Sequence, residues 1–276
     1  MKQPEKWKET VNPFDIQFEK FVLKEILGYP HARNDVFYCK GTMDGDVLGF
    51  LKYASKPDSD IANEIKALQQ LTFCFLPQIV ECDPAGKYVV TKEVAGERLS
   101  YLLHTTDAKS IDYMFKYGQT LAQIHAVSLP HEKVKHRKFF DLPSDDYLQQ
   151  WDIAFAKDFL ANKPHVVNEC FCHGDFHYAN ILWKDGEICA VLDWELCGIG
   201  NKEFDIAWAI INRPGQSFLN TQEEVLEFLR GYQSVGKCDE QLVRYYMALV
   251  YSHFISVGSQ PEYHQFVQNW LKQNAK

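Results

Sequence analysis

Three polar side chains, Asp175, Asn180 and Asp193, lie in two runs of the sequence that each have an apolar flank and a polar centre. The runs are FCHGDFHYANILW at residues 171–183 and ICAVLDWE at residues 188–195. Phosphoryl transfer needs this combination of groups. One carboxylate orients and deprotonates the attacking hydroxyl, while a second carboxylate and a carboxamide hold the Mg²⁺ that neutralises charge on the phosphates. Any one of these residues alone would more often be a turn former or a helix cap, but the joint pattern indicates a phosphotransfer site.

A β-hairpin is expected to hold these side chains together. Ile181 to Trp183 and Ile188 to Leu192 have the apolar, β-branched composition of short strands. The turn Lys184-Asp185-Gly186-Glu187 lies between them, and Asp-Gly is a strong hairpin signal. Asp175 and Asn180 precede the first strand and Asp193 directly follows the second, so folding of the hairpin should gather the three side chains.

The motif H-G-D-F-H-x-x-N at residues 173–180, followed by a strand and then D-W-E, resembles the aminoglycoside phosphotransferase and choline kinase family. That family shares the protein-kinase fold. The step from Asp175 to Asn180 equals the D-x-x-x-x-N step of the kinase catalytic loop. The resemblance implies that Asp175 is the catalytic base, that Asn180 and Asp193 are the metal ligands, and that ATP (or GTP) and Mg²⁺ are used.

The sequence departs from protein kinases in ways that favour a small-molecule kinase. Gly174 stands where protein kinases have Arg, Trp194-Glu195 replaces Phe-Gly, and no A-P-E segment follows. The segment Gly28 to Asn34 is not the G-x-G-x-x-G of protein kinases either, which leaves the choice between ATP and GTP open. Two residues are expected to support the catalytic segment: His173 should brace it, and Asp205 should hydrogen-bond it from behind.

The nucleotide side of the site is expected around Lys52. This lysine is the single charge within the apolar strand VLGFLKY, and burying an ammonium is costly without a partner. Glu64 shares a helix face with Ile61 and Leu68 and is its predicted partner. The resemblance makes Lys52 the contact to the α- and β-phosphates. Phe50 points to the same side of the strand as Lys52, where its ring could stack on the base or pack in a core.

A hinge between two lobes is identified at residues 91–96, TKEVAG, by the resemblance alone. It implies that the Lys92 carbonyl and the Val94 amide pair with the nucleotide base. The composition also changes near Gly96, from strand-like runs before it to helical periodicity after it. We therefore expect an N-terminal nucleotide-binding lobe at residues 1–94 and a catalytic, acceptor-binding lobe at residues 95–276.

The predicted fold class is α+β, with a protein-kinase-like two-lobed fold. The N-terminal lobe should be an antiparallel sheet with one helix, and the C-terminal lobe should be mainly helical. Strands are expected at residues 21–27, 35–40, 47–53, 78–81 and 87–94. Helices are expected at residues 61–71, 111–127, 144–160, 203–212, 222–233, 239–257 and 261–272.

Composition excludes several classes of protein. The net charge of −8 argues against nucleic-acid binding, which normally shows a basic stripe. The first residues lack the apolar core of a signal peptide, and no apolar run could span a bilayer, so we expect a cytoplasmic protein without a membrane partner. The eight cysteines form no C-x-x-C pair, and Cys170 and Cys172 lack a second ligand pair, so no metal is expected there.

The acceptor is expected to be a small hydroxylated molecule, and two signals bear on its charge. Carboxylates gather before and after the catalytic segment and favour a polyhydroxylated or amino-bearing acceptor such as an aminoglycoside or amino alcohol. These are Asp141, Asp145, Asp146, Asp152, Asp158, Glu223, Glu224, Glu227, Asp239 and Glu240. The basic run from Lys133 to Lys138 could instead meet an anionic acceptor. The sequence says nothing about the oligomeric state.

Two other functions fit parts of the pattern. A pseudokinase-like module would bind a nucleotide without catalysis, but such proteins usually lack one of the key side chains that are all present here. A metal-dependent hydrolase could use His173, Asp175, His177 and Asp193, and it would bind metal tightly without a nucleotide.

Overall fold

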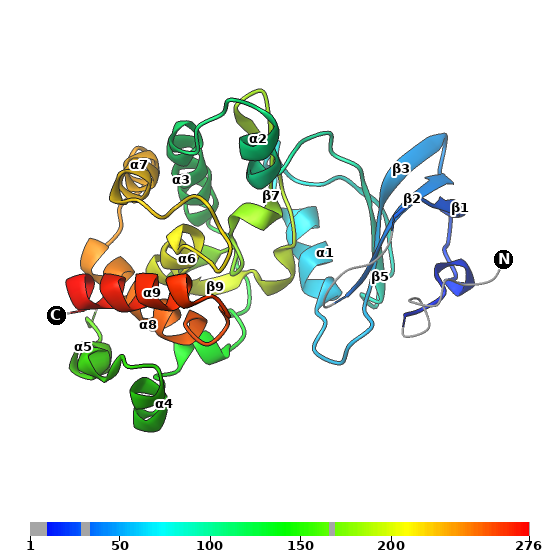
Figure 1. Ribbon diagram of the computed structural model, residues 1–276. Helices are drawn as coiled ribbons and strands as arrows, with labels where there is room; N and C mark the ends of the chain where they lie inside the picture. Colours follow the sequence, from blue (N-terminus) through cyan, green and yellow to red (C-terminus); the bar gives the residue numbers. More distant parts are fainter. Residues whose placement is uncertain (1–9, 29–33, 166–168, 276) are drawn as a thin grey trace. The chain divides into compact units, whose positions relative to one another are not determined.

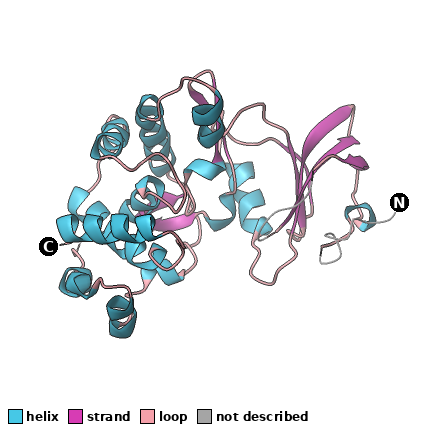
Figure 2. Ribbon diagram, in the orientation of Figure 1, coloured by secondary structure: helices cyan, strands magenta, loops and turns pink. Residues whose placement is uncertain are grey.

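The computed structural model describes residues 10–28, 34–165 and 169–275, and these form two compact units (Figures 1 and 2). The first unit contains the described residues up to Gly96, together with Leu182–Lys184 and Cys189–Cys197. The second contains Glu97–Ile181, Asp185–Ile188 and the residues from Gly198 onward. The chain passes from the first unit to the second after Gly96, but two later segments of the chain also belong to the first unit. Antiparallel strands and helices together give the α+β class.

The first unit is built on a five-stranded sheet in the order β1-β2-β3-β5-β4, in which all neighbours are antiparallel. Three strands, one helix and two strands follow each other along the chain, as expected. The elements are β1 (Val22–Ile26), β2 (Asp35–Thr42), β3 (Asp46–Tyr53), α1 (Ile61–Gln70), β4 (Ile79–Cys82) and β5 (Tyr88–Lys92).

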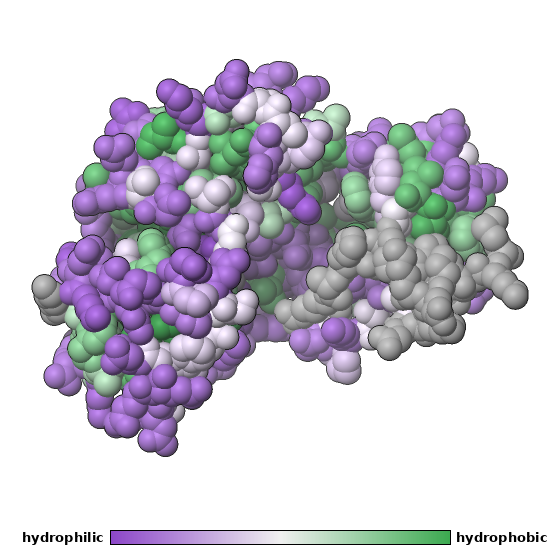
Figure 3. Space-filling view, viewed as in Figure 1, coloured by the Kyte–Doolittle hydropathy of each residue, from purple (hydrophilic) through white to green (hydrophobic). Residues whose placement is uncertain are grey.

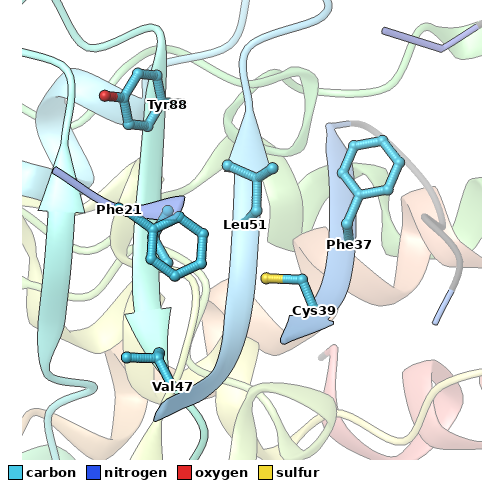
Figure 4. Close-up of a cluster of buried hydrophobic side chains, with 7 residues drawn as sticks. Phe21, Phe37, Cys39, Val47, Leu51 and Tyr88 are labelled. Carbon is cyan, nitrogen blue, oxygen red and sulfur yellow. The ribbon is translucent and has the colours of Figure 1, made fainter. Parts of the chain in front are cut away.

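One face of this sheet carries a hydrophobic core. Alternate residues of β2 and β3 are buried, and Phe37 lies opposite Leu51 in the antiparallel register. Figure 4 shows these two side chains with Phe21, Val47 and Tyr88 on the strands and the chain around them. The opposite face is covered by α1, whose Ile61 and Ile65 pack with Val89 of β5. Because Lys52 pairs with Val89 across β3 and β5, it lies on the α1 side.

Glu81 of β4 ties the segment before β1 to the sheet. Its two carboxylate oxygens accept hydrogen bonds from the backbone N–H groups of Glu19, Lys20 and Phe21 at 2.7–2.9 Å. The Tyr88 hydroxyl donates a fourth bond at 2.8 Å. Burial alone would raise the pKa of Glu81, but these hydrogen bonds outweigh it and lower the pKa.

We expect Glu81→Gln to reduce the free energy of unfolding at neutral pH by about 2 kcal/mol, the scale of hydrogen bonds to a charged group. Because the folded pKa is lowered, this contribution is present above the unfolded pKa and is lost as the pH falls through the folded pKa. The difference in melting temperature between the parent and Glu81→Gln should therefore shrink in acid. Glu19→Gln, which keeps the backbone bond, is the control; a pH-independent difference would contradict the assignment.

The second unit is mainly helical, with one small sheet. Its helices are α2 (Leu99–Thr105), α3 (Ile111–His125), α4 (Asp145–Gln150), α5 (Lys157–Ala161), α6 (Lys202–Ile210), α7 (Gln222–Gln233), α8 (Glu240–Phe254) and α9 (Pro261–Asn274). Strands β6 (Glu169–Cys172) and β9 (Gly198–Asn201) pair antiparallel. Neither α2 nor the β6–β9 pair was expected from the sequence.

The expected helix at residues 144–160 is wrong as a single element. Ser144 does cap a helix, because its side chain accepts from the Tyr147 N–H. That helix, α4, ends after Gln150, and Asp152 then has a left-handed backbone with φ 55°. A short 3-10 turn and the five-residue α5 follow. A non-glycine residue at positive φ cannot continue an α-helix, so the chain turns there.

Helices α3 and α7 pack closely, side by side in Figure 1. A Cβ on Gly118 of α3 would lie 1.9 Å from the Phe228 carbonyl oxygen, and one on Gly231 of α7 would lie 1.9 Å from that of Phe115. Only glycine therefore permits this approach at both positions. The crossing fixes α3, which ends at His125, against α7.

The hairpin predicted from the Asp-Gly turn is present. Strands β7 (Ile181–Lys184) and β8 (Glu187–Val191) form a two-stranded sheet, and Asp185 and Gly186 between them both have positive φ. Positive φ at both central residues defines the type I′ turn of tight hairpins.

The face of the second unit seen in Figure 3 is mostly hydrophilic, with hydrophobic residues in small separate groups. Such scattered groups are ordinary on protein surfaces. Among the residues that the structure describes, no helix combines the length and apolar content that crossing a bilayer would require.

Candidate active site

The first cluster of candidate residues, which we call the Lys52 cluster, lies in the first unit and consists of Lys52, Glu64, Asp193 and Glu195. The Lys52 ammonium lies 2.6 Å from Glu64 and 2.7 Å from Asp193, and Glu195 is 3.2 Å away. The predicted ion pair between Lys52 and Glu64 is therefore present. Burial alone would lower the pKa of Lys52, but the three carboxylates outweigh it and raise the pKa. Burial raises the pKa of Glu64 in spite of Lys52.

Glu195 is a member of this cluster that the sequence analysis did not assign. It is buried, and its carboxylate accepts from the Asn34 side chain at 2.7 Å and from the Asp60 N–H at 2.6 Å. Asp60 is the N-cap of α1, the helix that carries Glu64. Glu195 thus fixes the start of α1 while it faces Lys52. The signal available in the sequence was its place beside the D-W motif.

Asp193 has a backbone conformation that is rare for its residue type. Its φ and ψ are 62° and 65°, in the left-handed region, directly before a 3-10 turn at Trp194–Leu196. Non-glycine residues are held there only when their surroundings require it, often at functional sites. The side chain is 43% exposed, and one oxygen is bound by Lys52. The remaining oxygen is available to a ligand.

The second cluster, which we call the Asp175 cluster, lies in the second unit. Asp175 Oδ1 accepts from the Trp208 indole N–H at 2.8 Å, and the Asn180 amide donates to the Asp175 carbonyl at 3.0 Å and to Oδ2 at 3.3 Å. Arg137 and His177 lie 3.9 and 3.6 Å from its carboxylate. Burial would raise the pKa of Asp175, but His177 and Arg137 outweigh it and lower the pKa to about 2. The carboxylate is therefore ionised at neutral pH.

Trp208 and Arg137 are further residues that the sequence analysis did not assign. Trp208 lies on α6, three residues after Asp205. The Arg137 guanidinium lies 4.5 Å from the centroid of the Trp208 ring. The ring thus places its N–H on one carboxylate oxygen of Asp175 and supports a cation beside the same carboxylate.

Asp205 supports the loop between β6 and Asp175, as expected. Its two carboxylate oxygens accept from the backbone N–H groups of His173 at 2.9 Å and Gly174 at 3.1 Å. His173 is buried, and its Nδ1 accepts from the Asp175 N–H at 3.2 Å. Gly174 has φ 80°, which a side chain would disfavour. His173 is therefore used as a brace, which argues against the hydrolase alternative that needed it as a ligand.

The remaining predicted residues lie on or just after the sheet of the first unit. Phe50 lies on the same face of β3 as Lys52, its side chain is exposed, and its ring is 5.1 Å from that of Tyr38. Lys92 ends β5 and is exposed, and Val94 follows it. Their proposed contacts to a nucleotide base stay predictions. Residues 29–33, most of the loop from Gly28 to Asn34, lie outside the described residues.

Each cluster, taken by itself, contains an oxygen donor of a type that Mg²⁺ accepts. Asp193 offers a free carboxylate oxygen, and the Asn180 side-chain nitrogen is committed to Asp175, which leaves its carbonyl oxygen as an acceptor. Carboxylate and carboxamide oxygens are the protein ligands that Mg²⁺ accepts.

A family model described as "Phosphotransferase enzyme family" matches residues 30–239. Among curated relatives, mouse acyl-CoA dehydrogenase family member 11 is 28% identical over 188 residues, which is 66% of this chain and 20% of that protein. The chain thus spans about a fifth of the length of this relative.

Solved structures with the same fold cover nearly the whole chain. A choline/ethanolamine kinase family protein from Mesorhizobium loti aligns with a TM-score of 0.57 and 18% identity, covering 96% of this chain and 90% of that one. The amicoumacin kinase hAmiN, solved with AMP-PNP, Ca²⁺ and amicoumacin, aligns with a TM-score of 0.58 and 16% identity, covering 92% and 87%.

Proposed function

The chain belongs to the phosphotransferase enzyme family, and from this premise we propose that it transfers the γ-phosphate of ATP, with Mg²⁺, to a hydroxyl of a small molecule. The family resemblance inferred from the motifs is confirmed by the match over residues 30–239. The expected protein-kinase-like α+β fold is confirmed by the solved phosphotransferase and kinase structures that share it.

The observation that carries this proposal is the Lys52 cluster. Kinases of this fold need two features in place for catalysis, an ion pair between a strand lysine and a helix glutamate, and a metal-binding aspartate. In this chain the Lys52 ammonium contacts both Glu64 and Asp193, so it connects these two features. The ammonium is held by charge pairs on the α1 side of the sheet, so it is positioned to contact nucleotide phosphates. A pseudokinase-like module usually lacks one of the key side chains, so the presence of these three favours catalysis.

The chain's own groups have distinct tasks in the proposed reaction. Lys52 would hold the α- and β-phosphates. Mg²⁺, for which Asn180 and Asp193 are the proposed ligands, would neutralise charge on the phosphates. Asp175 orients the acceptor hydroxyl and receives its proton. The Trp208 N–H and the Asn180 amide hold the Asp175 carboxylate in one position. The low pKa of Asp175 keeps it ionised, so it can accept a hydrogen bond from the hydroxyl at neutral pH.

The nucleotide is proposed to be ATP, with GTP as the alternative. The hAmiN structure was solved with AMP-PNP, which supports an adenine nucleotide for this chain. Phe50, the Lys92 carbonyl and the Val94 amide are the proposed contacts to the base. A comparison of ATP with GTP in the turnover assay decides between them.

The acceptor is proposed to be an amino alcohol, an aminoglycoside-like compound or a related hydroxylated metabolite. Some of the acidic side chains that favoured a cationic acceptor have local partners, since Asp141 lies 3.0 Å from His136 and Glu224 forms the capping box of α7. The structure also brings Arg137 beside Asp175. The screen for the acceptor should therefore contain anionic compounds as well as cationic ones.

We expect ADP release by the full chain with MgATP to be stimulated by one class of acceptor. A screen should compare aminoglycosides, choline, ethanolamine, homoserine and amino sugars with sugar phosphates. Stimulation by cationic compounds supports the amino-bearing acceptor, and stimulation by anionic ones alone would overturn it. Tight MgATP binding with no stimulation by any compound would favour a non-catalytic module.

A further inference from the structure

Three side chains with metal-binding atoms meet in the second unit, outside the Asp175 cluster. Cys170 and Cys172 lie two residues apart on β6, so they share one face of the strand, and their sulfur atoms are 3.9 Å apart. His125, the last residue of α3, completes the group, with all three ligand atoms within 4.8 Å of one another. Among the described residues, this is the one group of three or more His, Cys, Asp or Glu side chains whose ligand atoms all lie this close to one another.

The third ligand explains why the sequence did not indicate this site. Cys170 and Cys172 have no second ligand pair nearby in the sequence, and His125 lies 45 residues before Cys170. Strand β6 packs against α3, which the α3–α7 crossing holds in place. Tertiary structure therefore supplies a ligand that local spacing could not predict.

The contacts of His125 leave one ring nitrogen suited to a metal ion. Nε2 lies 3.2 Å from Asp205 Oδ2, and Nδ1 lies 2.8 Å from the Tyr232 hydroxyl. The Asp205 carboxylate can only accept, so Nε2–H donates to it, and Nδ1 is the nitrogen whose lone pair a metal ion would take in place of the hydrogen bond to the Tyr232 hydroxyl. A carboxylate behind one imidazole nitrogen, with the other directed at the ion, is the usual arrangement of a histidine ligand.

The two thiols are also arranged for this chemistry. Their sulfur atoms lie within hydrogen-bonding distance of each other, and metals bind cysteine as the thiolate. In a tetrahedral site with Zn–S bonds of about 2.3 Å, two sulfur atoms lie about 3.8 Å apart. The observed 3.9 Å separation needs almost no change.

A pocket of about 310 Å³ gives access to the group from outside. His125, Cys170 and Tyr232 line it, together with Lys202 and Lys237. Burial raises the pKa of the Tyr232 hydroxyl, so it stays neutral and is a poor ligand at neutral pH. A water molecule from the pocket would complete four-coordination. Two thiolates and an imidazole are a donor set for Zn²⁺, whereas Mg²⁺ takes oxygen ligands.

We propose that Cys170, Cys172 and His125 form a Zn²⁺ site that is separate from the proposed magnesium site. The ion would join β6 to the end of α3. Its effect would reach the catalytic loop by two routes, because Cys172 directly precedes His173 and because Asp205 contacts both His125 and the loop amides. The expected role is to stabilise the loop's position, with no part in the chemistry.

The test uses the full chain, freed of metal by a chelator and kept reduced by a phosphine. We expect one Zn²⁺ per chain in competition with a chromogenic chelator, and a thiolate-to-metal absorption band when Co²⁺ is added instead. Zn²⁺ should raise the melting temperature of the parent. Cys170→Ser should weaken Zn²⁺ binding by at least about 100-fold and remove the Co²⁺–thiolate band. Cys172→Ser should do the same.

Cys74→Ser is the matched control, because Cys74 is exposed and lies in the first unit. It should leave Zn²⁺ affinity and the Co²⁺ band unchanged. Circular dichroism of the metal-free Ser variants checks that they are folded, and their MgATP affinity should equal that of the parent. Zn²⁺ affinity that is the same in the parent and both β6 variants, or a Co²⁺ spectrum without a thiolate band, would overturn the proposal. Neither result would bear on the phosphotransferase function.

Discussion

Asp175→Asn is expected to lower turnover by about 10²–10⁴-fold, the usual scale for loss of a general base. The amide has no charge to accept the hydroxyl proton, but it keeps the shape of the side chain and an oxygen for the Trp208 N–H. The affinity for MgATP should therefore stay close to that of the parent. Acceptor-stimulated ADP release measures the first effect, and calorimetry with MgATP measures the second.

Asp185→Asn is the matched control for this experiment. Asp185 is exposed in the β7–β8 turn with φ 52°, a conformation that Asn also adopts readily. This variant should retain the turnover of the parent. Turnover of Asp175→Asn within a factor of about two of the parent would rule out Asp175 as the base.

Lys52→Met is expected to lower turnover by at least about 10²-fold, because a preorganised charge that faces the phosphates is lost. It should also reduce the free energy of unfolding by about 3 kcal/mol, because Glu64 and Glu195 then remain buried near Asp193 without a cation. Turnover is read from ADP release with a saturating acceptor, and stability from denaturant melts at neutral pH.

A second substitution separates folding from function in this experiment. Lys52→Met combined with Glu64→Gln removes one buried charge of each sign and should recover part of the lost stability. It should not recover turnover. Lys56→Met, at an exposed lysine just after the same strand, is the control and should behave like the parent. Recovery of turnover in the double variant would mean that Lys52 acts only through folding.

Periodicity and local chemistry predicted much of this fold. The alternation in β2 and β3, the Asp-Gly turn before β8 and the capping of α4 by Ser144 all depend on neighbours in the sequence, so they could be read from it. The Lys52–Glu64 pair was also predictable, since one charge within an apolar strand needs a partner on the next element.

Features that depend on distant residues could not be predicted in the same way. The left-handed Asp152 divides a segment that has helical composition throughout. Trp208 was not assigned from the sequence, and its N–H reaches Asp175, which is 33 residues earlier. Glu195 binds the Asn34 side chain, 161 residues earlier. In each of these three cases tertiary packing decides the outcome, and the local sequence pattern does not indicate it.

The discontinuous first unit has a consequence for how the protein can be made. Its sheet is synthesised by Gly96, but Asp193 and Glu195 belong to it and come roughly 100 residues later. At about 5–20 residues per second, a ribosome needs roughly 5–20 s to add them. During that interval Lys52 and Glu64 have only each other, and the Asp60 N–H that starts α1 lacks its Glu195 acceptor. A nascent chain arrested before residue 193 should therefore be far more sensitive to protease in α1 than one arrested well beyond Cys197.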